Sequence, residues 1–349
     1  MYYDNQNPFG RDSYTTLMIK DTRRAFSRFH LGILAYIGSA YVISIIVDLI
    51  LFAIMGDSYT SLAENIYFQW GMGVLPMYAV GLPLLYITVR NMPTKNLPKS
   101  RLRLGEFLII FAIAQALMTV GNTIGTSLNA VFGEIRGEEI TNSTSELIEN
   151  SPIWLTLPVA VIIGPIIEEF IFRKLMLDRL SRYGAVVAIV ISGLSFGLFH
   201  GNLYQFFYAA LLGSLLAFVT LKTGNWLYSV ILHILINFFG SVLAMPFIDM
   251  LAEVEAGIAA IETGAELDIL SFANSALLLT SYALIEYALV IVGAVCLALA
   301  IKNKWYTIKN TAEVNIPKEE VTSAVIFNLG TMLFIAVSLV LCAISVLLG

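Results

Sequence analysis

The stretch from residue 324 to residue 348, AVIFNLGTMLFIAVSLVLCAISVLL, contains no charged side chain. As a helix it would measure about 37 Å, which exceeds the roughly 30 Å of a bilayer's hydrocarbon core. Comparable apolar runs recur towards the N-terminus, near residues 31–55, 66–90, 105–132, 153–177, 184–199, 203–221, 225–245 and 276–301. We therefore predict an all-α polytopic transmembrane helical bundle with about nine spans.

The composition supports a membrane protein and excludes several other classes. Of the 349 residues, 58% are hydrophobic and 13% are charged, and the mean hydropathy is +0.81. Soluble domains carry roughly 25% charged residues. This balance excludes a soluble enzyme, a disordered protein and a nucleic-acid binder, and it predicts a multi-pass protein of the cell membrane.

The charges predict the orientation of the chain. If the N-terminus is cytoplasmic, nine spans place every Lys and Arg except Arg136 on inner segments, whereas the outer segments are acidic. This segregation follows the positive-inside rule. We therefore predict a cytoplasmic N-terminus, with His30 at the cytoplasmic membrane interface.

Ionisable side chains inside a span are candidate functional groups because burying them in lipid is costly. The span 153–177 contains Glu168, Glu169 and Arg173. Residues four apart share a helix face, so Glu169 and Arg173 form a natural ion pair. Glu168 points elsewhere and is a candidate general base. The alternative, that both glutamates only brace helices, stays open.

Two further spans add polar groups. His233 and Asn237 share a helix face, so they can serve as paired oxyanion donors or as interhelical hydrogen-bonding groups. His200 ends a short run with Phe196 one turn before it. Because this run is too short to cross the hydrocarbon core, we expect the turn after His200 to lie within the membrane and to border a polar pocket.

These residues form three ordered motifs, Glu168-Glu169-x-x-x-Arg173, Phe196-x-x-x-His200 and His233-x-x-x-Asn237. Together they resemble the CAAX protease and bacteriocin-processing (CPBP) family of intramembrane proteases, which includes the type II CAAX prenyl endopeptidases. The resemblance covers about residues 153 to 240. It implies a protease core at 153–245, preceded by a cytoplasmic segment at 1–30 and accessory helices at 31–152. An outer loop and two C-terminal helices then occupy 246–349.

The resemblance also implies a mechanism. The matching catalytic residues are Glu168, His200, His233 and Asn237, and the supporting residues are Glu169, Arg173 and Phe196. The first glutamate and the first histidine would activate a water that attacks the scissile peptide, while the second histidine and the asparagine would stabilise the oxyanion. The implied substrate is a membrane-associated peptide or protein, and the implied chemistry needs no cofactor and no metal.

Three alternatives remain open. Glu168, His200 and His233 could bind a catalytic zinc ion with an open fourth position. The family also includes non-proteolytic membrane partners and bacteriocin self-immunity proteins. Buried Glu and His residues can, finally, relay protons in a transporter.

Overall fold

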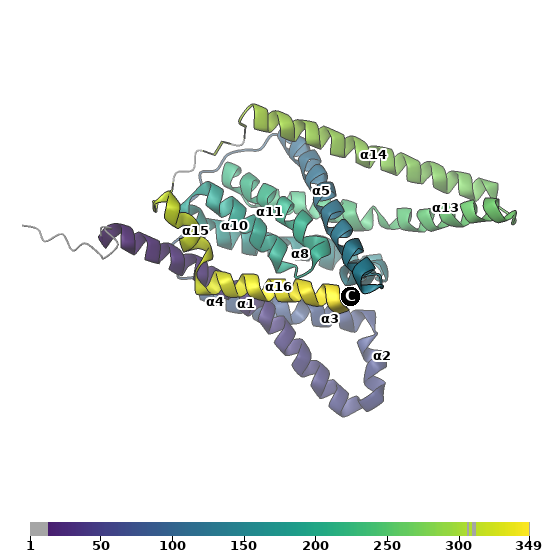
Figure 1. Ribbon diagram of the computed structural model, residues 1–349, viewed down its shortest axis with the longest axis horizontal. Helices are drawn as coiled ribbons and strands as arrows, with labels where there is room; N and C mark the ends of the chain where they lie inside the picture. Colours follow the sequence, from purple (N-terminus) through teal and green to yellow (C-terminus); the bar gives the residue numbers. More distant parts are fainter. Residues whose placement is uncertain (1–12, 306, 309–311, 349) are drawn as a thin grey trace, which may run out of the picture.

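The computed structural model describes residues 13–305, 307–308 and 312–348, and in this part the chain forms helices and no β-strand. Figure 1 shows the helices gathered around α8, α10 and α11. Eight helical runs of this part are long and apolar enough to cross a membrane: Ser13–Ala63, Ile66–Val89, Leu104–Arg136, Ile153–Tyr183, Leu203–Thr223, Leu227–Thr263, Ile269–Lys302 and Leu329–Leu347. The prediction of an all-α polytopic bundle is confirmed.

The remaining predicted span, residues 184–199, corresponds to α10 (Ala185–Phe199), which is apolar but has only 15 residues. Its length of about 22 Å is less than the hydrocarbon thickness of roughly 30 Å. The cytoplasmic position of the N-terminus stays a prediction, and residues 1–12 of the predicted segment 1–30 lie outside the described residues.

The N-terminal third forms one long helix, a return helix and a third span. Its elements are α1 (Ser13–Met55), η1 (Gly56–Ser58), α2 (Tyr59–Ala63), α3 (Ile66–Pro76), the π-helical η2 (Met77–Gly81), α4 (Leu82–Val89), α5 (Leu104–Arg136) and α6 (Ser143–Glu149). Helix α1 packs against α3, η2, α4 and α16, which places the return helix beside it.

The middle of the chain carries the predicted site residues. Its elements are α7 (Ile153–Thr156), the π-helical η3 (Leu157–Ile163), α8 (Gly164–Glu169), the π-helical η4 (Phe170–Met176), α9 (Leu177–Leu180), η5 (Ser181–Tyr183), α10, α11 (Leu203–Thr223), α12 (Leu227–Asn237) and the π-helical η6 (Phe238–Val242). Helices α10 and α11 pack along each other, and α11 also contacts α5.

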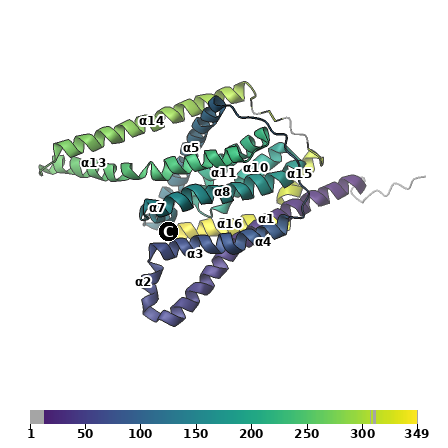
Figure 2. The same ribbon diagram turned by 180° about the vertical axis from the view of Figure 1, so that it is seen from behind.

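The C-terminal part contains a long hairpin and a last span. Its elements are α13 (Met245–Thr263), α14 (Ile269–Lys302), α15 (Lys318–Ile326) and α16 (Leu329–Leu348). Figures 1 and 2 show the α13–α14 hairpin extending away from the bundle. Helix α14 approaches α5 so closely that a Cβ on Gly293 would overlap the backbone of Ala112.

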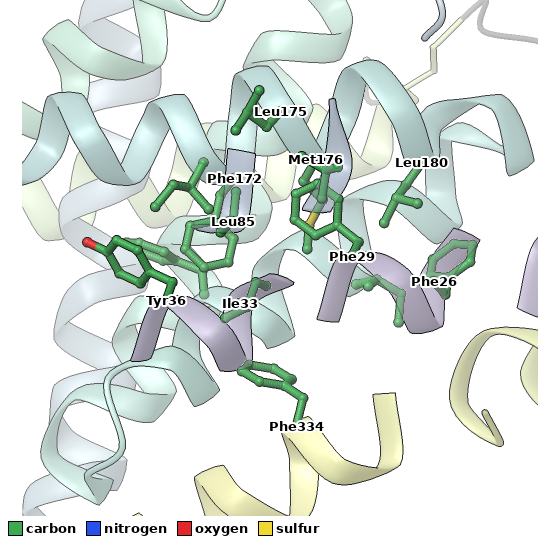
Figure 3. Close-up of a cluster of buried hydrophobic side chains, with 14 of the residues drawn as sticks. Phe26, Phe29, Ile33, Tyr36, Leu85, Phe172, Leu175, Met176, Leu180 and Phe334 are labelled. Carbon is green, nitrogen blue, oxygen red and sulfur yellow. The ribbon is translucent and has the colours of Figure 1, made fainter. Parts of the chain in front are cut away.

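The largest hydrophobic core holds α1 and α4 against the site-bearing segment. Figure 3 shows Phe29 of α1, Phe172 of η4 and Phe334 of α16 in this cluster. Each of these rings is at most 1% exposed. Close packing of this kind fixes the position of η4 relative to the accessory helices.

His30 is buried between helices, with 1% of its surface exposed, and its depth in the membrane stays a prediction. Its Nε2 lies 3.0 Å from the Oγ of Ser195 on α10, and its Nδ1 lies 3.0 Å from the Oγ1 of Thr331 on α16. The physical reason for this burial is that α1 begins at Ser13, well before the apolar run, and buries one face of this polar extension.

Candidate active site

The two glutamates lie at the end of α8, between two π-helical stretches. Residues Leu157–Ile163 precede α8, and residues Phe170–Met176 follow it. Pro158 and Pro165 each lack the N–H that a regular α-helix would donate, which accounts for a local interruption of the pattern. π-Helical turns occur frequently at functional sites, and they leave carbonyl groups available to other partners.

Glu169 and Arg173 form a sealed ion pair, as the spacing predicts. The Oε2 of Glu169 lies 3.1 Å from the Nε of Arg173, and neither side chain is exposed. The Nη2 of Arg173 donates to the carbonyl of Gly213 on α11 at 3.3 Å. Its Cζ lies 4.5 Å from the ring centroid of Phe196 on α10. The pair therefore ties η4 to both helices of the central hairpin.

His233 bridges the two glutamates. Its Nδ1 lies 3.0 Å from the Oε1 of Glu169, and its Nε2 lies 3.6 Å from the Oε2 of Glu168. An ionised carboxylate can only accept, so the Nδ1–H donates to Glu169 and Nε2 faces Glu168. A carboxylate that orients one imidazole nitrogen leaves the other nitrogen available for proton transfer or hydrogen bonding.

His200 approaches this group through aromatic contacts. The ring centroid of Phe196 lies 5.0 Å from that of His200 and 5.6 Å from that of His233. Within the described residues, no hydrogen bond or ion pair joins His200 to Glu168. His200 and His233 therefore lie against the same aromatic ring, that of Phe196.

Hydrogen bonds from the side chain of Asn202 stabilise the turn after His200. Gly201 adopts a left-handed conformation with φ of 64°, which glycine tolerates because it has no Cβ. The Nδ2 of Asn202 donates to the carbonyl of His200 at 3.2 Å, and its Oδ1 accepts from the backbone N–H of Gln205 at 2.8 Å. These bonds pair backbone polar groups of the tight turn between α10 and α11.

Asn237 forms an interhelical hydrogen bond, one of the two roles that its spacing from His233 left open. Its Nδ2 donates to the carbonyl oxygen of Ala160 at 3.1 Å. Ala160 lies in η3, whose π-helical pattern accounts for the available carbonyl. One N–H of the Asn237 carboxamide is thus used in holding α12 to η3, and the second N–H remains for another acceptor.

Three tyrosines near Glu168 belong to none of the three sequence motifs. Tyr36 of α1, Tyr78 of η2 and Tyr208 of α11 are all close enough for an electrostatic interaction with its carboxyl group. Tyr36 and Tyr78 lie on helices distant in sequence from the motifs, so no local spacing could have indicated them. Among the described residues, no group of three or more His, Cys, Asp or Glu side chains is arranged to hold a metal ion.

Two comparisons with known proteins find similarities. Residues 150–239 match the family model of Rce1-like type II CAAX prenyl endopeptidases. YdiL of Bacillus subtilis (strain 168), provisionally named a membrane peptidase, is 27% identical over 180 residues, which are 50% of this chain and 72% of YdiL. No solved structure matches the chain. The family match, this relative and the apolar helices together support a multi-pass membrane protease similar to the CPBP family, as the three motifs predict.

Proposed function

We propose that this chain is an intramembrane endopeptidase in which Glu168 activates the attacking water. The supporting observation is the contrast between two neighbouring glutamates. The side chain of Glu169 is sealed against Arg173, whereas that of Glu168 is 21% exposed and forms no ion pair with Lys or Arg among the described residues. A general base needs both access to water and a carboxylate that no cation neutralises.

The reaction follows from this contrast. Glu168, assisted by His200, accepts a proton as the water oxygen bonds to the scissile carbonyl carbon. The carbonyl oxygen then carries a negative charge, which the imidazolium form of His233, with a proton on Nε2, and the second N–H of Asn237 stabilise. When the C–N bond breaks, the proton passes from Glu168 to the leaving nitrogen. Glu169 holds His233 in place through Nδ1, and Arg173 neutralises Glu169.

The substrate that we propose is a peptide or protein anchored in or on the membrane. The site lies on helices that are long enough to cross a bilayer, and the matching family acts on CAAX prenyl sequences according to its name. We further propose that residues 153–245 form the protease core and that the helices before and after it are accessory.

The experiment compares wild-type protein with Glu168→Gln and Glu286→Gln, purified in detergent. Glu286 provides a matched control because it is a half-buried glutamate of a membrane helix, α14, outside the site. The probes are a fluorogenic farnesylated CAAX peptide and the same peptide without the farnesyl group. We expect Glu168→Gln to lower kcat by about 10²- to 10⁴-fold, the usual contribution of a general base.

The expected result is cleavage by the wild type and by Glu286→Gln, with cleavage lost in Glu168→Gln. Equal cleavage by Glu168→Gln and the wild type would refute the proposed role of Glu168. If the wild type cleaves neither peptide and Glu168→Gln still rescues cells that lack the protein, the non-proteolytic alternative gains support.

A further inference from the structure

Two tyrosines from the accessory helices lie beside the candidate catalytic glutamate. Tyr36 belongs to α1 and Tyr78 to η2, so both precede the segment 150–239 that matches the family model. Both phenol groups interact electrostatically with Glu168, and they also interact with each other. The two hydroxyls and the carboxyl group therefore share one small region inside the bundle.

The position of Tyr36 follows from its ring contacts. Tyr36 is 1% exposed, and its ring centroid lies 5.7 Å from that of Phe199. Phe199 in turn contacts His200, with 5.6 Å between their ring centroids. Figure 3 shows Tyr36 at the edge of the hydrophobic cluster, with its hydroxyl directed away from the other labelled side chains. The ring of Tyr36 therefore packs in the hydrophobic core, and its hydroxyl points out of the core.

The position of Tyr78 follows from a glycine. Its hydroxyl oxygen would lie 3.9 Å from a Cβ added to Gly164. Gly164 is four residues before Glu168 in the same helical run, so the two residues share a helix face. The Tyr78 hydroxyl therefore lies next to the helix face that carries Glu168.

Neither hydroxyl has a hydrogen-bond partner among the described residues. A hydroxyl that has no partner within the protein can donate its proton to a group that enters from outside. Two of the hydrogen-bond donors that the motif residues supply are already bound to acceptors within the protein. Nδ1–H of His233 is bound to Glu169, and one N–H of Asn237 is bound to Ala160.

We propose that Tyr36 and Tyr78 are further catalytic residues, whose hydroxyls donate hydrogen bonds to the scissile carbonyl oxygen as it becomes negatively charged. This inference rests on the proposed endopeptidase function. A phenol is a suitable donor because it gives its proton to a developing oxyanion without carrying a charge into the apolar site. The accessory helices α1 and η2 thus complete a site that the segment 150–239 leaves short of donors.

The experiment measures kcat and KM for Tyr36→Phe and Tyr78→Phe on the peptide that the wild type cleaves. Tyr41→Phe is the matched control, because Tyr41 lies on the same helix as Tyr36 and is 52% exposed. We expect each site variant to lower kcat by roughly 10- to 100-fold with KM unchanged, because the oxyanion exists only in the transition state. The apparent melting temperature should not fall, since the removed hydroxyl has no partner within the protein.

Glu168→Gln in the same assay distinguishes a failure of the proposed endopeptidase function from a failure of the proposed tyrosine role. If Glu168→Gln abolishes cleavage while both Phe variants keep kcat within twofold of the wild type, the tyrosine inference alone is overturned. A rise in KM with unchanged kcat also overturns it, because that result indicates a role in substrate binding. If Glu168→Gln cleaves normally, the proposed function fails and the tyrosine inference fails with it.

Discussion

Removing the guanidinium of Arg173 should destabilise the bundle strongly. Both side chains of the ion pair between Arg173 and Glu169 are fully buried. Arg173→Met therefore leaves the carboxylate of Glu169 buried without its cationic partner. Loss of one partner of a buried ion pair costs about 3–5 kcal/mol. We expect the lower end, about 3 kcal/mol, because Glu169 keeps the bond from Nδ1 of His233. This corresponds to a fall in apparent melting temperature of roughly 5–10 °C.

A double variant tests whether the unpaired charge of Glu169 causes the loss of stability. Glu169→Gln/Arg173→Met removes both charges, and the methionine can still pack against Phe196, so we expect a loss of only about 1 kcal/mol. The matched control is Lys174→Met. Lys174 and Asp178 also form an ion pair, at 2.7 Å, but their side chains are 46% and 19% exposed. Such a pair contributes about 0.5 kcal/mol.

The assay is thermal unfolding of the three purified variants in one detergent, followed by intrinsic fluorescence and by monodispersity on size exclusion. The expected order of stability is Lys174→Met, then the double variant, then Arg173→Met. A single variant Arg173→Met as stable as Lys174→Met would refute the reasoning. A double variant less stable than Arg173→Met would also refute it, since the cost would then not come from an unpaired charge.

The remaining predictions concern helix packing, a buried histidine and metal chemistry. Gly193→Ala should lower the apparent melting temperature, because the added Cβ would lie 2.9 Å from the backbone nitrogen of Ser214, whereas Gly38→Ala, with no described atom within 4 Å, should not. His30→Phe should lower the free energy of unfolding by about 1–3 kcal/mol, because the hydroxyl of Ser195 loses its hydrogen-bond partner in the core. An unchanged melting temperature would show that Ser195 finds another partner. EDTA should leave cleavage unchanged, and a loss of cleavage that zinc restores would favour the zinc alternative.

The sequence alone predicted the helical class, most of the spans and the ion pair of Glu169 with Arg173. These features depend on local physics. Bilayer thickness fixes how long an apolar run must be, and the helical repeat places residues four apart on one face. The same repeat separated Glu168 from the ion pair, and the structure agrees, with Glu168 partly exposed and Glu169 sealed.

The sequence could not predict how the site residues meet across helices. Spacing placed Asn237 beside His233, but it could not reveal that the carbonyl of Ala160 would take one N–H of the carboxamide. The apolar boundary near residue 31 suggested an interfacial His30, but it could not reveal that the helix starts at Ser13 and buries this side chain. Both contacts escape prediction because a helical pattern does not encode the contacts that neighbouring helices make.

Length, hydropathy and the 3.6-residue repeat are local properties, and they are enough to predict a helical membrane protein with a Glu-Glu-x-x-x-Arg helix and two histidine-bearing helices. Contacts between helices, which the sequence pattern does not reveal, place His233 between the two glutamates and bring Tyr36 and Tyr78 near Glu168. The physical reason is that the rotation and offset of packed helices depend on side chains that interlock across distant parts of the chain.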